Sequence, residues 1–268
     1  MALIVASRSS HFSFFFFIRM LRTIKILWIR QLKRYSRSKA RMLSSLGMPV
    51  LLLIALGFGF GPVVARTGGG NYMSFIAPGV VGMAILFASV FNGIELIADR
   101  QFGFLKETLV APVPRSAIMI GRTLGGATVA VCQGLLVLVV SVFFGLHSIT
   151  VGGFLFSLVF MALEAFLLTS FGTAVATQMN DMQAYPLMIN FIIMPMFFLS
   201  SALFPPENFP PLLQFIARIN PITYAVDGIR ASLINSVTPH FSLDFTVLIV
   251  LCALVLALGT HLFAKMEV

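Results

Sequence analysis

Charged and nucleophilic side chains are scarce in this chain, so the few it has, and their spacing, limit the chemistry it can perform. Only 10% of its 268 residues are charged. It contains no Gly-Lys dipeptide, which excludes a phosphate-binding loop of the form G-x-x-x-x-G-K-[ST]. The patterns H-E-x-x-H and C-x-x-C are also absent, and the four histidines are scattered. We therefore predict a protein that is not an enzyme, with no catalytic residues, no metal ligands and no directly bound cofactor.

Glu164 is the one carboxylate predicted near the middle of a long apolar run. A charged side chain at the centre of a bilayer costs about 3 kcal/mol on insertion scales, so such a residue faces protein or water or carries a proton. Two interpretations of Glu164 stay open. It lines a substrate pathway, or it makes a polar contact between helices.

A charged segment, residues 98–115, separates two apolar runs. Its sequence predicts a short amphipathic helix at a membrane surface, closed by Pro112 and Pro114. The charged side chains of Lys106 and Glu107 fall on a different side of this helix from its apolar residues. The apolar residues are Phe102, Phe104, Leu105, Leu109 and Val110. A partner protein with an apolar groove and complementary charges would explain both sides, and the alternatives are a solvated loop or a helix that rests on the membrane.

Two further short helices are predicted before the last apolar run. Residues 212–219 and 222–234 are apolar but too short to cross a bilayer, and Asn220-Pro221 separates them. We predict that both dip back into the membrane as re-entrant helices. Asp227 and Arg230, spaced i,i+3, are able to pair on the second of them.

The elements that position these residues follow from the composition, which is 59% apolar. A soluble domain carries about 25% charged residues, so this chain is predicted to be an all-α integral membrane protein. About 20 apolar residues cross a bilayer. Six runs meet this length: about 45–64, 72–97, 117–146, 151–177, 184–204 and 242–264.

The distribution of positive charge orients these spans. All but three of the 18 lysines and arginines fall on one predicted side, and the exceptions are Arg66, Arg218 and Arg230. Because cytoplasmic loops are enriched in Lys and Arg, we predict that both termini are cytoplasmic. The net charge of +9 then reflects membrane topology, and no nucleic-acid partner is expected.

The N-terminal 44 residues divide into two parts. Residues 1–19 are an extension, and translation that begins at Met20 would remove it. Residues 20–44 predict a cytoplasmic amphipathic helix against membrane lipid, with Trp28 and Tyr35 near the level of the headgroups. This helix is either a simple anchor or a docking element.

In four stretches the chain resembles the membrane subunit of ABC-2 type exporters, most closely the daunorubicin-resistance type of multidrug permease. Residues 30–35 (RQLKRY) resemble the elbow helix of that family, and residues 76–79 (IAPG) resemble the start of its second span. Residues 102–115 resemble its first cytoplasmic loop. Residues 199–230 resemble the signature before its last span. The resemblance covers residue 20 to the C-terminus, so 45–268 would form the ABC-2 type transmembrane domain.

The resemblance implies a fold, partners and site residues. It implies six spans, a second permease copy and two cytoplasmic ATPase subunits that hold ATP and Mg²⁺. Residues 98–115 would be the coupling helix on the ATPase, with Phe102, Phe104, Leu105, Lys106, Glu107 and Leu109 at the contact. The re-entrant helices would cap the outer mouth, with Asn220, Pro221, Tyr224, Asp227 and Arg230 as their marked residues.

The expected function is export across the cell membrane, along a path between two permease copies lined by spans one, two and five. The 28 phenylalanines favour an amphiphilic or hydrophobic cargo, drug-like or lipid-like. Export of a polysaccharide or lipid-linked glycan is the alternative. An ion-coupled secondary transporter is a weaker one because, apart from Glu164, few ion ligands are present. A structural or sensory membrane protein is the remaining class.

Overall fold

The computed structural model describes residues 2–66, 72–110, 113–146, 149–234 and 241–266, and within these it leaves out the side chains of 2–17, 40, 41, 44, 64, 65 and 109. The described part is helical and contains no strand. Its elements are α1 (Ala2–Arg37), α2 (Lys39–Arg66), α3 (Tyr72–Phe91), α4 (Gly93–Gln101), α5 (Phe104–Val110), α6 (Arg115–Phe143), α7 (Val151–Thr177), α8 (Ala184–Phe198), the 3-10 turn η1 (Pro206–Asn208), α9 (Pro211–Ile219), α10 (Pro221–Ile234) and α11 (Phe241–Lys265).

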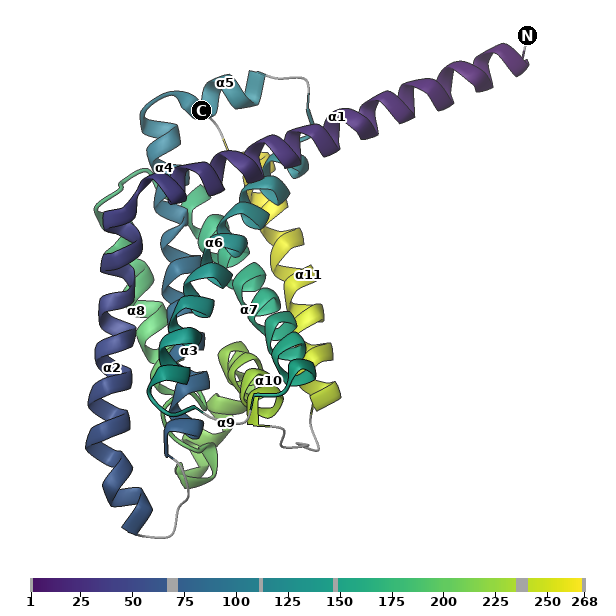
Figure 1. Cartoon of the computed structure of the whole chain (residues 1–268). Helices are drawn as coiled ribbons and strands as arrows, with labels where there is room; N and C mark the ends of the chain where they lie inside the picture. The colour runs from purple at the N-terminus through teal and green to yellow at the C-terminus, as the bar shows by residue number, and fades with distance from the viewer. Residues whose placement is uncertain (1, 67–71, 111–112, 147–148, 235–240, 267–268) are drawn as a thin grey trace.

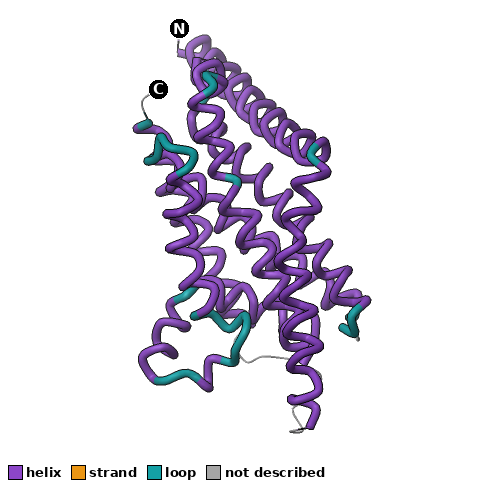
Figure 2. Tube along the Cα trace, turned by 90° about the vertical axis from the view of Figure 1, so that its left-hand side faces the viewer, coloured by secondary structure: helices purple, strands orange, loops and turns teal. Residues whose placement is uncertain are grey.

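The long helices form one bundle with two different ends (Figure 1). At one end α1 lies across the bundle beside α4 and α5, and both termini are found there. At the opposite end lie α9 and α10. Figure 2 shows the same bundle from the side, where the long N-terminal helix runs obliquely over one end of it. The charged segment and the two short helices are thus kept at opposite ends of the molecule.

Within the described residues, five helical stretches are long and apolar enough to cross a membrane. They are Ser45–Val63, Tyr72–Gln101, Arg115–Phe143, Val151–Thr177 and Phe241–Lys265. The stretch that contains α3 is the most buried of the five, and those of α2 and α11 are the least buried. The core is therefore centred on α3, which packs against α6, α7 and α10, while α2 and α11 lie at the edges.

The expected span 184–204 is shorter in the structure. The helix α8 ends at Phe198 after 15 residues, and turns follow up to Phe204. Ser200 favours this ending, because its hydroxyl donates to the carbonyl of Phe197 and accepts from the backbone N–H of Ala202. Pro205 then has an extended backbone and separates these turns from η1.

Three other boundaries differ from the sequence predictions. The helix expected over 20–44 ends at Arg37, and α2 begins directly after Ser38. The expected extension 1–19 is continuous with the amphipathic helix, since α1 runs from Ala2. The expected span 72–97 is interrupted at Asn92, where α3 ends and α4 begins, and α4 continues to Gln101.

Two glycines of α6 let α1 approach closely. A Cβ at Gly121 would lie 3.1 Å from the Cα of Ile24, and one at Gly125 would lie 2.6 Å from the Cβ of Gln31. The Gly-x-x-x-Gly spacing in the sequence indicated helix packing of this kind. The indole N–H of Trp28 also donates to the hydroxyl of Thr128 at 2.9 Å, so α1 is fixed on α6.

Candidate functional site: a charged junction, a short helix and a cavity

Asp99 on α4 is the centre of a charged junction between three helices. Its Oδ2 accepts from a guanidinium N–H of Arg122 on α6 at 2.6 Å. Its Oδ1 accepts from Arg30 on α1 at 3.2 Å, and Arg34 lies 3.5 Å from the same oxygen. The side chains of Asp99 and Arg122 are only 5% and 9% exposed, whereas that of Arg30 is 40% exposed. The strongest link of the junction is therefore the buried pair of Asp99 and Arg122.

A second link joins α1 to the start of α4. The side-chain amide of Gln31 donates to Asn92 Oδ1 at 2.6 Å and also to the carboxylate of Glu95. Arg34 lies 3.7 Å from the same Glu95 carboxylate. Gln31, Asn92 and Glu95 are all buried, so this link lies inside the protein at the place where α3 gives way to α4.

The helix α5 is set apart from α4 by a sharp turn at Gly103, whose φ of 81° favours glycine. The sequence had placed Phe102 and Phe104 on one helix, but Phe102 is the C-cap of α4 and Phe104 begins α5. Phe104 lies beneath the guanidinium of Arg30, with 6.0 Å between Arg30 Cζ and the ring centroid. The turn therefore directs α5 back towards α1.

The predicted contact residues of α5 divide into an inner and an outer group. Leu105 is buried against its own chain, so the expectation that it faces a partner does not fit its place in the structure. Phe102, Phe104, Lys106 and Glu107 are exposed. We call these four residues the α5 surface. The side chain of Leu109 lies outside the described residues.

Side-chain contacts anchor both flanks of the α5 surface. The amide of Gln101 donates to the carbonyl of Asn180, in the turn after α7, at 2.7 Å. Arg115, at the start of α6, donates to the carbonyls of Ala264 at 2.6 Å and Met266 at 3.1 Å. The α5 surface thus belongs to an end of the bundle that is tied together across α4, α6, α7 and α11.

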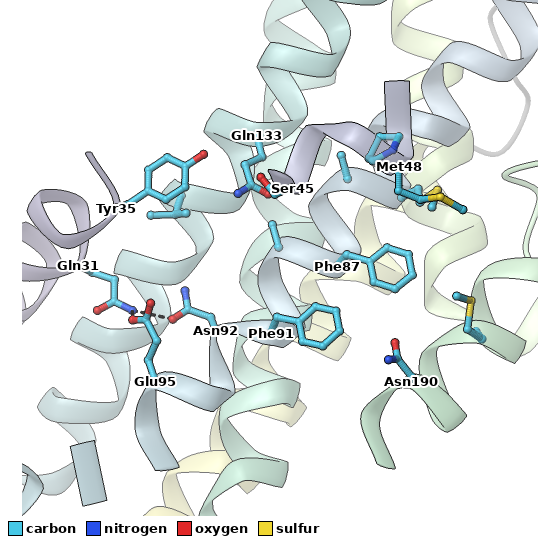
Figure 3. A pocket seen from close by; sticks show the side chains of 16 residues that line it. Gln31, Tyr35, Ser45, Met48, Phe87, Phe91, Asn92, Glu95, Gln133 and Asn190 are labelled. Atoms are coloured by element: carbon cyan, nitrogen blue, oxygen red, sulfur yellow. Dashed lines mark hydrogen bonds between the residues drawn. The ribbon is translucent and has the colours of Figure 1, made fainter. Parts of the chain in front are cut away.

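A cavity of about 380 Å³ opens beside the charged junction, between α1, α2, α3, α4, α6 and α8 (Figure 3). Its walls are largely apolar, with Met48, Phe87 and Phe91 among them. Polar side chains also reach it, including Gln31, Asn92 and Glu95 of the junction. Gln133 and Asn190 line this cavity from α6 and α8, and neither was predicted as a site residue from the sequence. Their signal was available, because each is an uncharged polar residue inside an otherwise apolar run.

Arg230 joins three elements at the opposite end of the molecule. Its guanidinium donates to Asp227 at 2.7 Å, to the carbonyl of Ser201 at 2.7 Å and to the carbonyl of Phe75 at 3.3 Å. The Arg230 Cζ also lies 4.2 Å from the centroid of the Phe75 ring. The predicted pairing of Asp227 with Arg230 is present. Burial raises the pKa of the Asp227 carboxyl, while the positive charge of Arg230 acts in the opposite direction.

The break between α9 and α10 lies where the sequence placed it. The Oδ1 of Asn220 accepts from the backbone N–H of Ile222 at 3.1 Å, and the Asn220 amide donates to the carbonyl of Met196. Pro221 occupies the first position of α10, where its missing N–H costs nothing. The hydroxyl of Tyr224 donates to the carbonyl of Arg218 at the end of α9. These contacts hold the two short helices against each other and against α8.

Glu164 lies inside the bundle rather than on the wall of the cavity. Its side chain is buried, the whole residue being 1% exposed, and within the described part of the chain neither carboxylate oxygen has a hydrogen-bond partner. A Cβ at Gly82 on α3 would lie 3.3 Å from Glu164 Oε1 and 2.7 Å from the side chain of Val226 on α10. The carboxyl group is therefore packed where α3, α7 and α10 meet.

We expect Glu164→Leu to stabilise the fold by about 1–3 kcal/mol, because it removes a buried polar group that no neighbour satisfies. Thermal unfolding of the purified chain in detergent measures this change. Glu107→Leu, at an exposed glutamate, is the control and should shift stability by at most about 0.5 kcal/mol. A lower stability of Glu164→Leu would show that the carboxyl group makes a stabilising contact between helices.

The fold and these sites define a helical membrane protein with several spans, a short exposed helix at one end and a cavity among its spans. The chain belongs to the ABC-2 type transporter family, whose profile matches residues 22–234. It is 30% identical to the putative transport permease ycf38 of Cyanophora paradoxa over 83% of this chain and 76% of that protein. It is 26% identical to Nodulation protein J of Rhizobium leguminosarum bv. viciae, over 89% of this chain and 93% of the relative. It is 27% identical to the inner membrane transport permease YadH of Escherichia coli (strain K12), over 77% of this chain and 81% of that protein.

Proposed function

We propose that this protein is the membrane subunit of an ATP-binding-cassette exporter that moves an amphiphilic cargo out of the cytoplasm. A separate ATPase subunit, present in two copies with ATP and Mg²⁺, docks on the α5 surface. The observation that carries this proposal is the exposure of Phe102 and Phe104 where α4 turns into α5, a segment anchored to the bundle through the buried pair of Asp99 and Arg122. Exposed aromatic residues of this kind commonly mark protein interfaces.

The charged junction can transmit a displacement of the α5 surface to the membrane-spanning helices. A push on α5 reaches α4 across the short turn at Gly103, and only Asn92 separates α4 from α3. Asp99 passes the same displacement to α6 through Arg122 and to α1 through Arg30. The junction is thus a candidate two-state element whose balance nucleotide binding on the partner would shift.

A second permease copy is proposed for the face formed by α2 and α8. Large apolar side chains are exposed there on both sides of the cavity, among them Leu51 and Phe58 on α2 and Leu187 and Phe191 on α8. A second copy on this face would enclose the cavities of both subunits in one path, lined by α2, α3 and α8. The exposed apolar side chains of α11, at the other edge of the bundle, are left for membrane lipid.

The proposed topology has six spans, with α8 as the short fifth span, α1 at the cytoplasmic surface and α9 and α10 re-entrant from the outer side. The arrangement of the termini supports it, because both lie at the end that carries α1 and α5. Most lysines and arginines fall at this end, as the positive-inside rule requires of the cytoplasmic side.

The proposed cargo class follows from the cavity, which combines apolar walls with a few polar side chains. That combination suits a drug-like or lipid-like amphiphile, the cargo expected of a daunorubicin-type permease. A lipid-linked glycan is the second candidate, because the cavity is also lined by four side-chain amides, and amides suit hydroxyl groups.

Phe104→Asp tests the docking proposal. Copurification with the proposed ATPase subunit should fall at least about 30-fold, because an aromatic contact at the centre of an interface contributes about 2 kcal/mol or more. Phe204→Asp is the matched control: Phe204 is 53% exposed, against 52% for Phe104, but lies beyond α8 at the opposite end of the molecule. Equal copurification of both variants and the native chain would contradict docking at α5.

A further inference from the structure

The cavity beside the charged junction has a polar part whose hydrogen-bonding groups are not all used by the protein. Gln31, Asn92 and Glu95, at its α1 side, bond to one another. Gln133 and Asn190 also border the cavity, and within the described residues neither side-chain amide has a hydrogen-bond partner. In Figure 3 these two residues lie on either side of the rings of Phe87 and Phe91. Two amides thus face an apolar space with their donors and acceptors available.

The rings of Phe87 and Phe91 form an apolar wall between these two amides. The rings are stacked, with centroids 6.1 Å apart and an angle of 15° between their planes. Met48, Met83 and Met194 extend the apolar lining from α2, α3 and α8. Aromatic rings and flexible thioethers adapt to alkyl chains and to the faces of rings. This wall therefore suits the apolar part of an amphiphile, whose polar part would lie at the amides.

The charges around the cavity select against a negatively charged polar part. Among the described residues that line it there is no lysine or arginine, and the one charged side chain is Glu95. The nearby Arg34 lies within 4 Å of both Glu95 and Asp99, so its charge is already compensated. A phosphate or carboxylate would leave water without a cation to receive it, which is costly in a largely apolar site.

We propose that this cavity binds the uncharged, hydroxyl-bearing head of an amphiphile, and that Gln133 and Asn190 are the residues that hydrogen-bond to it. Each side-chain amide both donates and accepts, as a hydroxyl group does, so the two chemistries are complementary. The volume of about 380 Å³ falls in the range of sites for small molecules. This inference rests on the proposed export function and names the cargo class: an amphiphile with a sugar-like or polyol head, rather than one with a phosphate head.

The test compares three probes that share an eight-carbon tail: octyl glucoside, octyl phosphate and octyltrimethylammonium. The full chain is held in amphipol, the probes are kept below their micelle concentrations, and binding is measured by calorimetry and by the fluorescence of Trp28, the one tryptophan of the chain. Octyl glucoside should bind at least about tenfold more tightly than octyl phosphate, because the phosphate head must be desolvated without a cation to receive it. It should also bind more tightly than octyltrimethylammonium, because the carboxylate of Glu95 is already paired with Arg34 and a trimethylammonium group cannot hydrogen-bond to the amides. Equal or tighter binding of a charged probe overturns the inference.

Variants of the two amides locate the binding. Gln133→Leu and Asn190→Leu should each weaken the binding of octyl glucoside about 3- to 10-fold, which is the loss expected for one hydrogen bond. The affinity for octyl phosphate should stay unchanged in both variants. Gln183→Leu, an exposed glutamine at the start of α8, is the matched control. Unchanged affinity for octyl glucoside in the two leucine variants overturns the assignment of these residues.

ATP-driven export in vesicles that also contain the proposed ATPase subunit separates this inference from the function on which it rests. If the protein exports cargo but binds the three probes without selectivity, the proposed cargo class is rejected and the proposed export function stands. If the protein binds octyl glucoside selectively but shows no ATP-driven export, the proposed export function is rejected and the proposed binding site stands.

Discussion

Asp99→Asn should destabilise the protein by about 3–5 kcal/mol, the loss typical when one partner of a buried ion pair is removed. This substitution would leave the guanidinium of Arg122 in a buried position without the negatively charged oxygen that now lies 2.6 Å away. The change in volume is small, so the loss reports charge rather than packing. Titration of the purified chain with denaturant, followed by circular dichroism, measures it.

Two further variants separate the buried pair from the exposed part of the junction. Arg30→Ala should cost no more than about 1 kcal/mol, because Arg30 is 40% exposed and its attraction to Asp99 is screened by water. The double variant of Asp99→Asn with Arg122→Met should recover most of the stability, since no unpaired charge is then buried. A loss for Asp99→Asn no larger than that for Arg30→Ala would show that Arg122 does not depend on this carboxylate.

The same double variant bears on the coupling mechanism. It should fold and still bind the ATPase, because the α5 surface is unchanged, yet export less cargo per ATP hydrolysed. The physical reason is that α4 then lacks its ionic link to α6, so a displacement of α5 is passed on less completely. Normal coupling in that variant would mean that the continuity of α4 with α3 is sufficient.

Local sequence signals predicted the parts of the fold that local chemistry decides. Asn220-Pro221 fixed the break between α9 and α10, since the asparagine caps and the proline starts a helix. The glycines at 121 and 125 indicated a close helix contact, and α1 makes it. The position of α5 was also visible, because a charged amphipathic segment between apolar runs is rare in such a chain.

Features that depend on three-dimensional neighbours were not predictable in the same way. An apolar periodicity does not say what covers an apolar side chain, so Leu105 was expected on a partner but is buried in its own bundle. The interruption at Asn92 was missed because Asn92 is held by Gln31, which is far away in sequence. The cavity was missed for the same reason, since it exists only where six helices meet.

Arg230→Met should also destabilise the fold, by about 2–3 kcal/mol, although methionine fills a similar volume, because the Ser201 carbonyl loses its donor while the partly exposed carboxylate of Asp227 stays partly solvated. The variant leaves Asp227 without its close partner and removes the donor to the Ser201 carbonyl and the cation that faces the Phe75 ring. The stability of Arg230→Lys should fall between that of the native protein and that of Arg230→Met. Lysine keeps the positive charge but lacks the planar fork with which arginine serves several acceptors at once. Thermal unfolding in detergent ranks the three proteins.

Arg218→Met is the matched control, because Arg218 is an exposed arginine on the adjacent helix α9. Its replacement should change stability by at most about 0.5 kcal/mol. Arg230 ties the start of α3, the turn after α8 and the helix α10 into one unit, so its loss should also weaken export by loosening the end of the molecule that is proposed to close the outer mouth. If Arg230→Met were as stable as Arg218→Met, the three elements would be held together by apolar packing, in which Gly79 lies against the backbone of Ala202, and not by the guanidinium.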